Sequence, residues 1–311
     1  MLSRRNFVRS TLGAGLAVTS QVAQPAPAQT PTAPAARRRL IVDAQVHLWT
    51  THSPELPWVP GGRPQQPEPF TIERVLALMD EAGVDRVIVV PPTLTGHRND
   101  YGIEAAKRYP NRFAVMGRFP VDNPRAADLL PRWKEQPGML GIRVSFNTPD
   151  TAAWLKNGTA DWFWPAAEKA GVPVMFLAPG DLAHFAGIAE RHPQLTLIVD
   201  HIGMNNTIPI TQSAADTIAL AKYPNVSVKM KAGAQYAPEP YPYRVMNVQL
   251  QRVFEAFGPQ RCYWETDITQ TLKEGGYRQR IAHFTEELSF LSEDDKGWVM
   301  GRAILARLKW A

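Results

Sequence analysis

The sequence Ile41-Val42-Asp43-Ala44-Gln45-Val46-His47-Leu48-Trp49 alternates polar and apolar residues, as a β-strand does. Successive side chains of a strand point to opposite faces, so Asp43, Gln45 and His47 are predicted to share one face. Only apolar side chains fall on the other face. A half-exposed strand would show the same alternation, but its solvent-exposed face typically carries Lys, Glu or Thr. Because a histidine at a strand end is often a ligand or an acid/base group, the polar face is expected to line a site that includes His47.

The N-terminal residues have the composition of an export signal. Ser3-Arg4-Arg5-Asn6-Phe7 precedes a mild apolar run from Thr11 to Val18 and a small-residue pattern, Ala26-Pro27-Ala28. The run is too short for a transmembrane helix, so it predicts a cleaved twin-arginine signal peptide over residues 1–28, export by the twin-arginine translocase and a periplasmic location. The alternative is a basic, disordered arm.

The rest of the chain is expected to be a short tether and one folded domain. Residues 29–39, rich in Ala, Pro, Gln and Thr, predict a disordered tether, and residues 40–311 the folded part. The formal net charge of +5 includes three arginines of the signal segment, and outside residues 37–39 no block of Lys or Arg suggests nucleic acid or membrane insertion. Cys262 is the only cysteine, which excludes an intramolecular disulfide and a cysteine zinc site.

A unit of strand, loop and amphipathic helix repeats along the folded part. After the first strand, strands are predicted at 86–90, 113–119, 141–146, 172–177, 195–201, 226–231 and 261–269. A first helix between Thr71 and Gly83 is followed by helices predicted near 100–109, 124–136, 159–170, 181–191, 211–222, 244–257, 277–289 and from Ser292 onward. Eight such α/β units predict a single (β/α)₈ TIM barrel. An open doubly wound sheet is the alternative, but the first strand lacks the glycine-rich turn expected there.

The barrel predicts that polar residues collect where strands end, because those ends meet on one face. The sequence meets this expectation at five strands, which carry Asp200-His201, Glu265-Thr266-Asp267, Gly141-Ile142-Arg143, Gly117-Arg118 and the pair Lys229 and Lys231. Three other histidines, His184, His192 and His283, fall on outer helices and are expected at the surface.

Several of these motifs together resemble the amidohydrolase superfamily. They are Asp43-Ala44 with His47-Leu48-Trp49, Gly141-Ile142-Arg143, Asp200-His201-Ile202-Gly203, Asp267, and Met300-Gly301-Arg302-Ala303 in the closing helix. The sequence looks most like the second family of this group, whose lactonases act on 2-pyrone-dicarboxylate, sugar lactones and sulfomuconolactone. The resemblance implies a hydrolase that opens the ring of a carboxylated or sulfonated lactone, such as a muconolactone or pyrone derivative, in aromatic-compound catabolism.

The chain departs from the metal-binding pattern of that family. Gln45 stands where the first histidine of a His-x-His pair is expected, and the fifth strand offers no ligand. His47, His201 and Asp267 remain, and they would hold a single zinc or manganese ion if a metal is used. A neutral amide is a poor zinc ligand, so no metal cofactor is expected to be required.

The resemblance also implies roles for the remaining residues. Asp267 is expected to act as general base toward water, and His47 and His201 to stabilise the negative charge on the carbonyl oxygen, with Gln45 beside them. Arg143, Arg118 and Lys231 are expected to bind the acid group of the substrate, and Tyr236 to line the mouth of the site. Specificity is expected to lie in loops 50–70 and 234–244.

Two alternatives remain open at this point. One is a zinc-dependent amidohydrolase or an aromatic-acid decarboxylase of the same superfamily. The other is a catalytically degenerate periplasmic barrel that only binds an acidic ligand.

Overall fold

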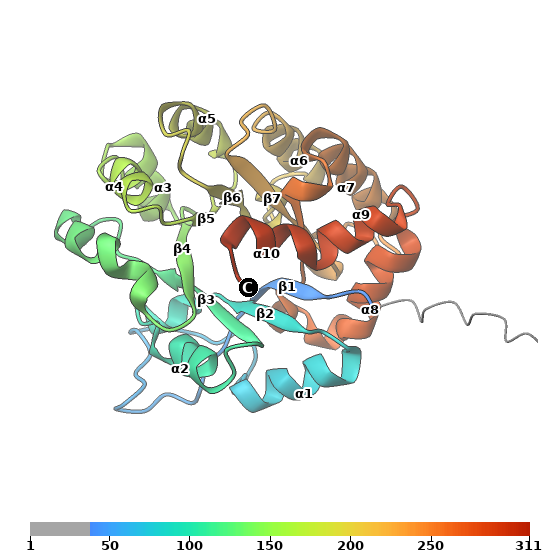
Figure 1. The fold of residues 1–311 in the computed structure, drawn as a ribbon, viewed down its shortest axis with the longest axis horizontal. Helices are drawn as coiled ribbons and strands as arrows, with labels where there is room; N and C mark the ends of the chain where they lie inside the picture. Colours follow the sequence, from blue (N-terminus) through green and yellow to red (C-terminus); the bar gives the residue numbers. More distant parts are fainter. Residues whose placement is uncertain (1–37) are drawn as a thin grey trace, which may run out of the picture. The chain divides into compact units, whose positions relative to one another are not determined.

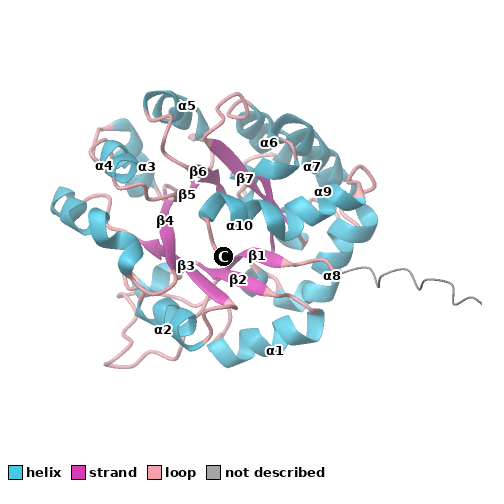
Figure 2. Cartoon of the chain, in the orientation of Figure 1, coloured by secondary structure: helices cyan, strands magenta, loops and turns pink. Residues whose placement is uncertain are grey.

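The computed structural model describes residues 38–311, in which eight parallel strands stand in the order of the chain. The predicted signal peptide and residues 29–37 of the predicted tether lie outside the described residues. The strands are β1 Val42–Val46, β2 Arg86–Val89, β3 Phe113–Arg118, β4 Met139–Ser145, β5 Val174–Leu177, β6 Leu197–Val199, β7 Val226–Lys231 and β8 Cys262–Glu265. Helices surround them (Figures 1 and 2), so the predicted TIM barrel is confirmed and the open doubly wound sheet is excluded.

Strands β1 and β8 complete the ring without a regular ladder between them. Each strand from β1 to β7 pairs in parallel with the next one in sequence. At the seam, Asp267 N donates to Gln45 O at 3.1 Å, and Thr266 N donates to the Asp43 carboxylate at 2.9 Å. A side chain therefore supplies part of the pairing that closes the barrel.

The outer helices follow the predicted alternation, with local differences. They are α1 Ile72–Ala82, α2 Asp100–Arg108, α3 Pro149–Lys156, α4 Phe163–Lys169, α5 Leu182–Arg191, α6 Ile210–Ile218, α7 Arg244–Phe257, α8 Tyr277–Ala282, α9 Glu293–Gly297 and α10 Ala303–Leu308. As expected, Thr71 caps α1 and Gly83, with φ 77°, ends it. Among residues 38–311, none of these helices has both the length and the apolar composition to cross a membrane.

Two segments differ from the prediction for local reasons. Residues Pro124–Glu135 form a 3₁₀ helix and not an α-helix, because Pro131 inside the segment cannot donate a backbone hydrogen bond. The helix α3 was not predicted. It begins with a capping box in which the side chains of Thr148 and Thr151 each accept from the other's backbone.

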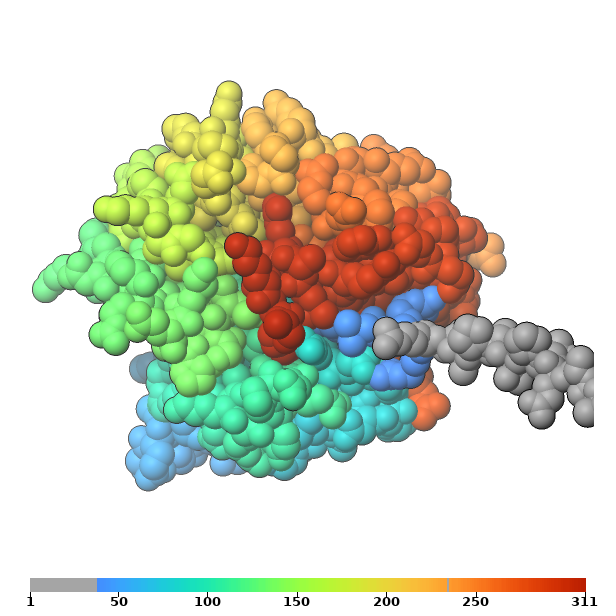
Figure 3. Space-filling view, viewed as in Figure 1, coloured from blue at the N-terminus to red at the C-terminus, as the bar shows by residue number. Residues whose placement is uncertain are grey.

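The lower half of the barrel interior is apolar. Val42, Ala44, Ile88, Met116, Met175, Ile198 and Tyr263, from six strands, form one buried cluster there with residues of α10. Figure 1 shows α10 crossing this end of the barrel, and in Figure 3 the C-terminal segment lies over the centre of the same face. The apolar lower half leaves the opposite end, where the strands finish, for polar side chains.

His283 contradicts the expectation of a surface position. Its side chain is 0% exposed, and its Nε2 bonds to Asn247 Oδ1 at 2.7 Å. Burial, with Arg280 nearby, lowers its pKa to about 4. The sequence periodicity placed it on an outer helix, but α8 passes at His283 into a single π-turn that directs the ring inward. His184 is exposed and His192 partly so, as expected.

We expect the buried His283 to make the protein sensitive to acid. The pKa of the ring is lower in the folded state than in the unfolded state, so this contribution to stability is complete above pH 6.5. It is then lost as pH falls toward 4, by about 1.4 kcal/mol per pH unit. Urea unfolding of the wild type and of His283→Gln between pH 7 and 4.5 measures this. An equal pH slope in the two proteins would contradict the assignment.

Candidate active site

Strand β1 does not present one continuous polar face. Val42 and Ala44 pack inside the barrel, so Asp43 between them points outward. There the Tyr277 hydroxyl of α8 donates to Asp43 Oδ2 at 2.9 Å. The predicted polar face is therefore wrong at Asp43, which holds the barrel to its outer layer.

An irregularity in β1 then turns the chain so that the next polar residues face inward. The register with β2 shifts between Asp43 and Val46, as at a β-bulge, which reverses the faces of the residues that follow it. Gln45 N, left without a strand partner, donates to Asp43 Oδ1 at 3.1 Å. As a result, Gln45 and His47 both lie inside the barrel mouth.

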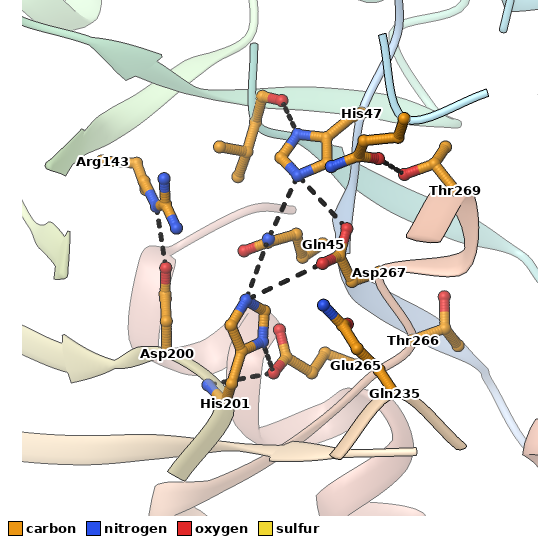
Figure 4. Close-up of polar contacts among 12 residues, drawn as sticks. Gln45, His47, Arg143, Asp200, His201, Gln235, Glu265, Thr266, Asp267 and Thr269 are labelled. Carbon is orange, nitrogen blue, oxygen red and sulfur yellow. Dashed lines mark hydrogen bonds and ion pairs between the residues drawn. The ribbon is translucent and has the colours of Figure 1, made fainter. Parts of the chain in front are cut away.

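The ring of His47 bridges the backbone of β2 and the end of β8. Its Nδ1 donates to Val90 O at 2.6 Å, and its Nε2 lies 3.2 Å from Asp267 Oδ1 (Figure 4). Because a carbonyl oxygen only accepts, Nδ1 carries a proton and Nε2 is the nitrogen presented to the site.

His201 approaches the same carboxylate from the other side. Its Nδ1 and its backbone N both bond to Glu265 Oε1, the latter at 3.1 Å. Its Nε2 lies 3.9 Å from Asp267 Oδ2 and 3.3 Å from Gln45 Nε2. Glu265 thus fixes the orientation of the ring so that both imidazole Nε2 atoms, of His47 and His201, converge on Asp267 (Figure 4).

The backbone is strained where these groups are mounted. His201, Ile202 and Asp267 have left-handed φ values of 54°, 56° and 44°. Such conformations cost about 1–3 kcal/mol each and are concentrated at functional sites. Hydrogen bonds from His201 N to Glu265 and from Asp267 N to Gln45 O stabilise them.

A network of ion pairs lies directly beneath His47, His201 and Asp267. Arg143 Nε donates to Asp200 Oδ2 at 2.8 Å, and Lys229 Nζ lies 2.8 Å from Asp200 Oδ1 and 3.1 Å from Glu265 Oε2. Burial opposes the ionisation of Asp200, but Lys229 and Arg143 outweigh it and lower the pKa to about 2. Asp200 is therefore ionised at neutral pH.

Asp267 is likewise kept ionised. Burial alone would raise its pKa, but Lys231 and His47 hold that pKa well below its usual range. Lys231 Nζ lies 3.5 Å from Asp267 Oδ2 and donates to Thr266 O at 2.8 Å. Lys231 is fully buried behind the carboxylate, so the structure places it as a partner of Asp267 and not on the cavity wall.

These groups open into a cavity of about 170 Å³ at the end of the barrel. Its wall includes the predicted residues Gln45, His47, Arg143, His201, Tyr236 and Asp267, and also Arg63, Gln65, Ser145 and Asn147. Tyr236 lies where predicted, its ring 6.0 Å from that of His201. The volume suits a compact small molecule.

Arg118 lies behind the cavity wall. Its Nη1 donates to Ser145 Oγ at 3.2 Å, and Ser145 also accepts from Arg143. Burial and the neighbouring Arg143 lower the pKa of Arg118 to about 9. Arg118 forms none of the ion pairs found among residues 38–311. Around the cavity, five cations (Arg63, Arg118, Arg143, Lys229 and Lys231) face three carboxylates (Asp200, Glu265 and Asp267), which leaves a positive excess.

Sequence reasoning did not assign three of these residues. Lys229 and Glu265 each stand two positions before a predicted site residue, so the alternation of the strand was an available signal for an inward position. Arg63 had no such signal. It lies in the proline-rich loop after β1, where no periodicity indicates direction.

The family comparison identifies the group to which this barrel belongs. The family described as Amidohydrolase matches residues 42–304, nearly all of the described chain. The chain belongs to the amidohydrolase family. The resemblance expected from the sequence is confirmed, and with it the prediction of a hydrolase.

Several known proteins resemble this amidohydrolase. An L-fucono-1,5-lactonase from Burkholderia ambifaria is 24% identical over 234 residues, 73% of this chain and 79% of that protein. A 4-sulfomuconolactone hydrolase from Hydrogenophaga intermedia is 26% identical over 211 residues, 66% of this chain and 67% of that protein. A solved amidohydrolase from Burkholderia multivorans, with bound zinc, has a TM-score of 0.73 at 19% identity, covering 87% of this chain and 99% of that one. This last likeness concerns the fold alone.

Zinc in that solved structure raises the question of a metal here. His47, His201 and Asp267 supply donors that zinc prefers, two imidazoles and a carboxylate. The space beside these donors is taken by an amide group, however, because Nε2 of Gln45 lies 3.5 Å from Nε2 of His47 and 3.3 Å from Nε2 of His201. An amide N–H is not a metal ligand, and Lys231 already pairs with Asp267. The donor set as arranged does not fit a divalent ion.

We expect Asp43→Asn to destabilise the barrel. Two backbone N–H groups and two hydroxyls donate to the Asp43 carboxylate; in asparagine the NH₂ group replaces one oxygen, so the two hydroxyls lose their acceptor and would have to reverse and accept from a neutral amide. The expected loss is about 2–3 kcal/mol in the free energy of unfolding, against about 1 kcal/mol for Tyr277→Phe, which removes one donor. Urea unfolding measures both. A loss below about 0.5 kcal/mol for Asp43→Asn would contradict the role of this carboxylate at the seam.

Proposed function

We propose that this amidohydrolase hydrolyses a lactone that carries a carboxylate or sulfonate group. The observation that supports this most directly is the cavity itself. Its wall has an ionised Asp267 with two imidazoles on one side and Arg143 with Ser145 on another. The two curated relatives, named for a sugar lactone and for a sulfonated lactone, support the same reaction class.

In the proposed reaction, Asp267 accepts a proton from a water molecule as the water oxygen attacks the lactone carbonyl carbon. Negative charge then develops on the carbonyl oxygen. Donors from Gln45, His47 and His201 stabilise that charge, because their nitrogens converge beside Asp267. The bond to the ring oxygen breaks, and the proton returns from Asp267 to that oxygen. The product is a hydroxy acid, and no metal takes part.

The acid group of the substrate is proposed to bind on the arginine side of the cavity. Arg143 lines this wall, Arg118 stands behind it through Ser145, and Arg63 lines the rim. A guanidinium matches the geometry of a carboxylate or sulfonate. The positive excess around the cavity favours an anion over a neutral lactone. The twin-arginine pattern supports the periplasm as the place of this reaction.

We expect Asp267→Asn to lower kcat by about 10³-fold with little change in KM, because the substitution removes the general base but keeps the size and shape of the side chain. The assay is hydrolysis of a panel of carboxylated and sulfonated lactones. Asp150→Asn, an exposed change in the first turn of α3, is the control and should retain wild-type rates.

Two results would contradict this proposal. Full activity of Asp267→Asn on every lactone that the wild type opens would exclude the base. Tight binding of lactones by the wild type without turnover would instead favour a barrel that only binds an acidic ligand.

A second prediction tests the recognition of the acid group. Arg118→Met removes the unpaired charge at similar volume, so KM for an anionic lactone should rise by about 10- to 100-fold. KM for a neutral lactone of the same ring should hardly change. Arg125→Met, on the surface, is the control. Equal effects on both lactones would show that Arg118 acts on the fold and not on the charge of the substrate.

A further inference from the structure

The centre of the barrel holds a lysine side chain surrounded by oxygen atoms. Lys229 is 0% exposed. Its Nζ donates to Gln45 Oε1 and lies 2.8 Å from Asp200 Oδ1 and 3.1 Å from Glu265 Oε2. The ammonium thus makes one hydrogen bond, to the Gln45 amide, and two ion pairs, to Asp200 and Glu265. Its three partners are mounted on three strands or strand ends.

The contact with Lys229 fixes which way the Gln45 amide faces. An ammonium only donates, so the amide atom beside it is the oxygen. The NH₂ group must therefore face the other way, toward Nε2 of His201 at 3.3 Å and Nε2 of His47 at 3.5 Å. The amide hydrogens therefore fill the space beside the two Nε2 atoms where a metal ion would have to bind.

The same ammonium holds two carboxylates that would otherwise repel each other. The second oxygen of Asp200 accepts from Arg143, and the second oxygen of Glu265 accepts from His201. A continuous chain of charges therefore runs from Arg143 to His201 through Lys229. A buried carboxylate pair without a cation is strongly unfavourable.

We propose that Lys229 is a positioning residue that takes the place of a divalent ion in this barrel: it neutralises Asp200 and Glu265 and turns the Gln45 amide so that the imidazoles face N–H groups. We expect the ammonium and a divalent ion to exclude each other, because Lys229 Nζ and the two imidazoles contact the same Gln45 amide and like charges in a buried site repel strongly. Replacing both residues should convert the site into one that binds zinc.

Zinc affinity of purified variants tests this, measured by competition with a chromophoric chelator and by elemental analysis after gel filtration. The wild type and Gln45→His should bind zinc weakly. Gln45→His combined with Lys229→Met should bind it at least about 100-fold more tightly than Gln45→His alone. Gln45→His combined with Lys134→Met removes an exposed lysine instead and should match Gln45→His.

Stability provides a second measurement. Lys229→Met removes the cation between two buried carboxylates and should melt at a lower temperature, while zinc should restore the melting temperature only when Gln45→His is also present. Equal zinc affinity of Gln45→His with and without Lys229→Met, no zinc effect on an unstable double variant, or tight stoichiometric zinc in the wild type would each overturn the proposal. None of these measurements uses a lactone, so failure of the lactonase assignment is a separate result.

Discussion

The seam between the first and last strands is the constraint on which the rest of this barrel depends. The ladder is missing there, and the Asp43 carboxylate replaces it by accepting from the backbone of both strands and from Tyr277 on the outside. An outward Asp43 requires the irregularity that follows it in β1. That irregularity turns Gln45 and His47 inward, and the Asp267 backbone binds to Gln45 across the same seam. Closure of the fold and the geometry of the site thus depend on the same residues.

Beneath the site, the barrel interior has an apolar half and a charged half. The lower half is apolar and sealed by α10, whereas the upper half contains ion pairs with almost no contact to water. Burying such charges is costly unless every one is paired and hydrogen-bonded. The chain of ion pairs from Arg143 through Asp200 and Lys229 to Glu265 gives each of these charges a partner of opposite sign. It also leaves the imidazoles and Asp267 in fixed orientations, which is what a site that stabilises developing charge needs.

Much of the architecture was predictable from local patterns. The eight repeated strand and helix units predicted the barrel. The predicted ends of the strands indicated His47, His201, Asp267 and Arg143 as site residues, because the strand ends of a parallel barrel meet on one face. Other features were not predictable. The outward direction of Asp43 and the burial of His283 depend on single-residue irregularities, a bulge and a π-turn, that shift the periodicity on which sequence reasoning relies.

Gln45 illustrates which features could be predicted from the sequence and which depend on the fold. The amino-acid sequence places an amide where the family pattern has a histidine, which weakens the case for a metal. The orientation of that amide follows from the fold, because it is set by Lys229, which is far away along the chain and adjacent only once the barrel closes. Residue identity determines the donors and acceptors available, whereas the packing of β1 against β7 and β8 determines which of them meet.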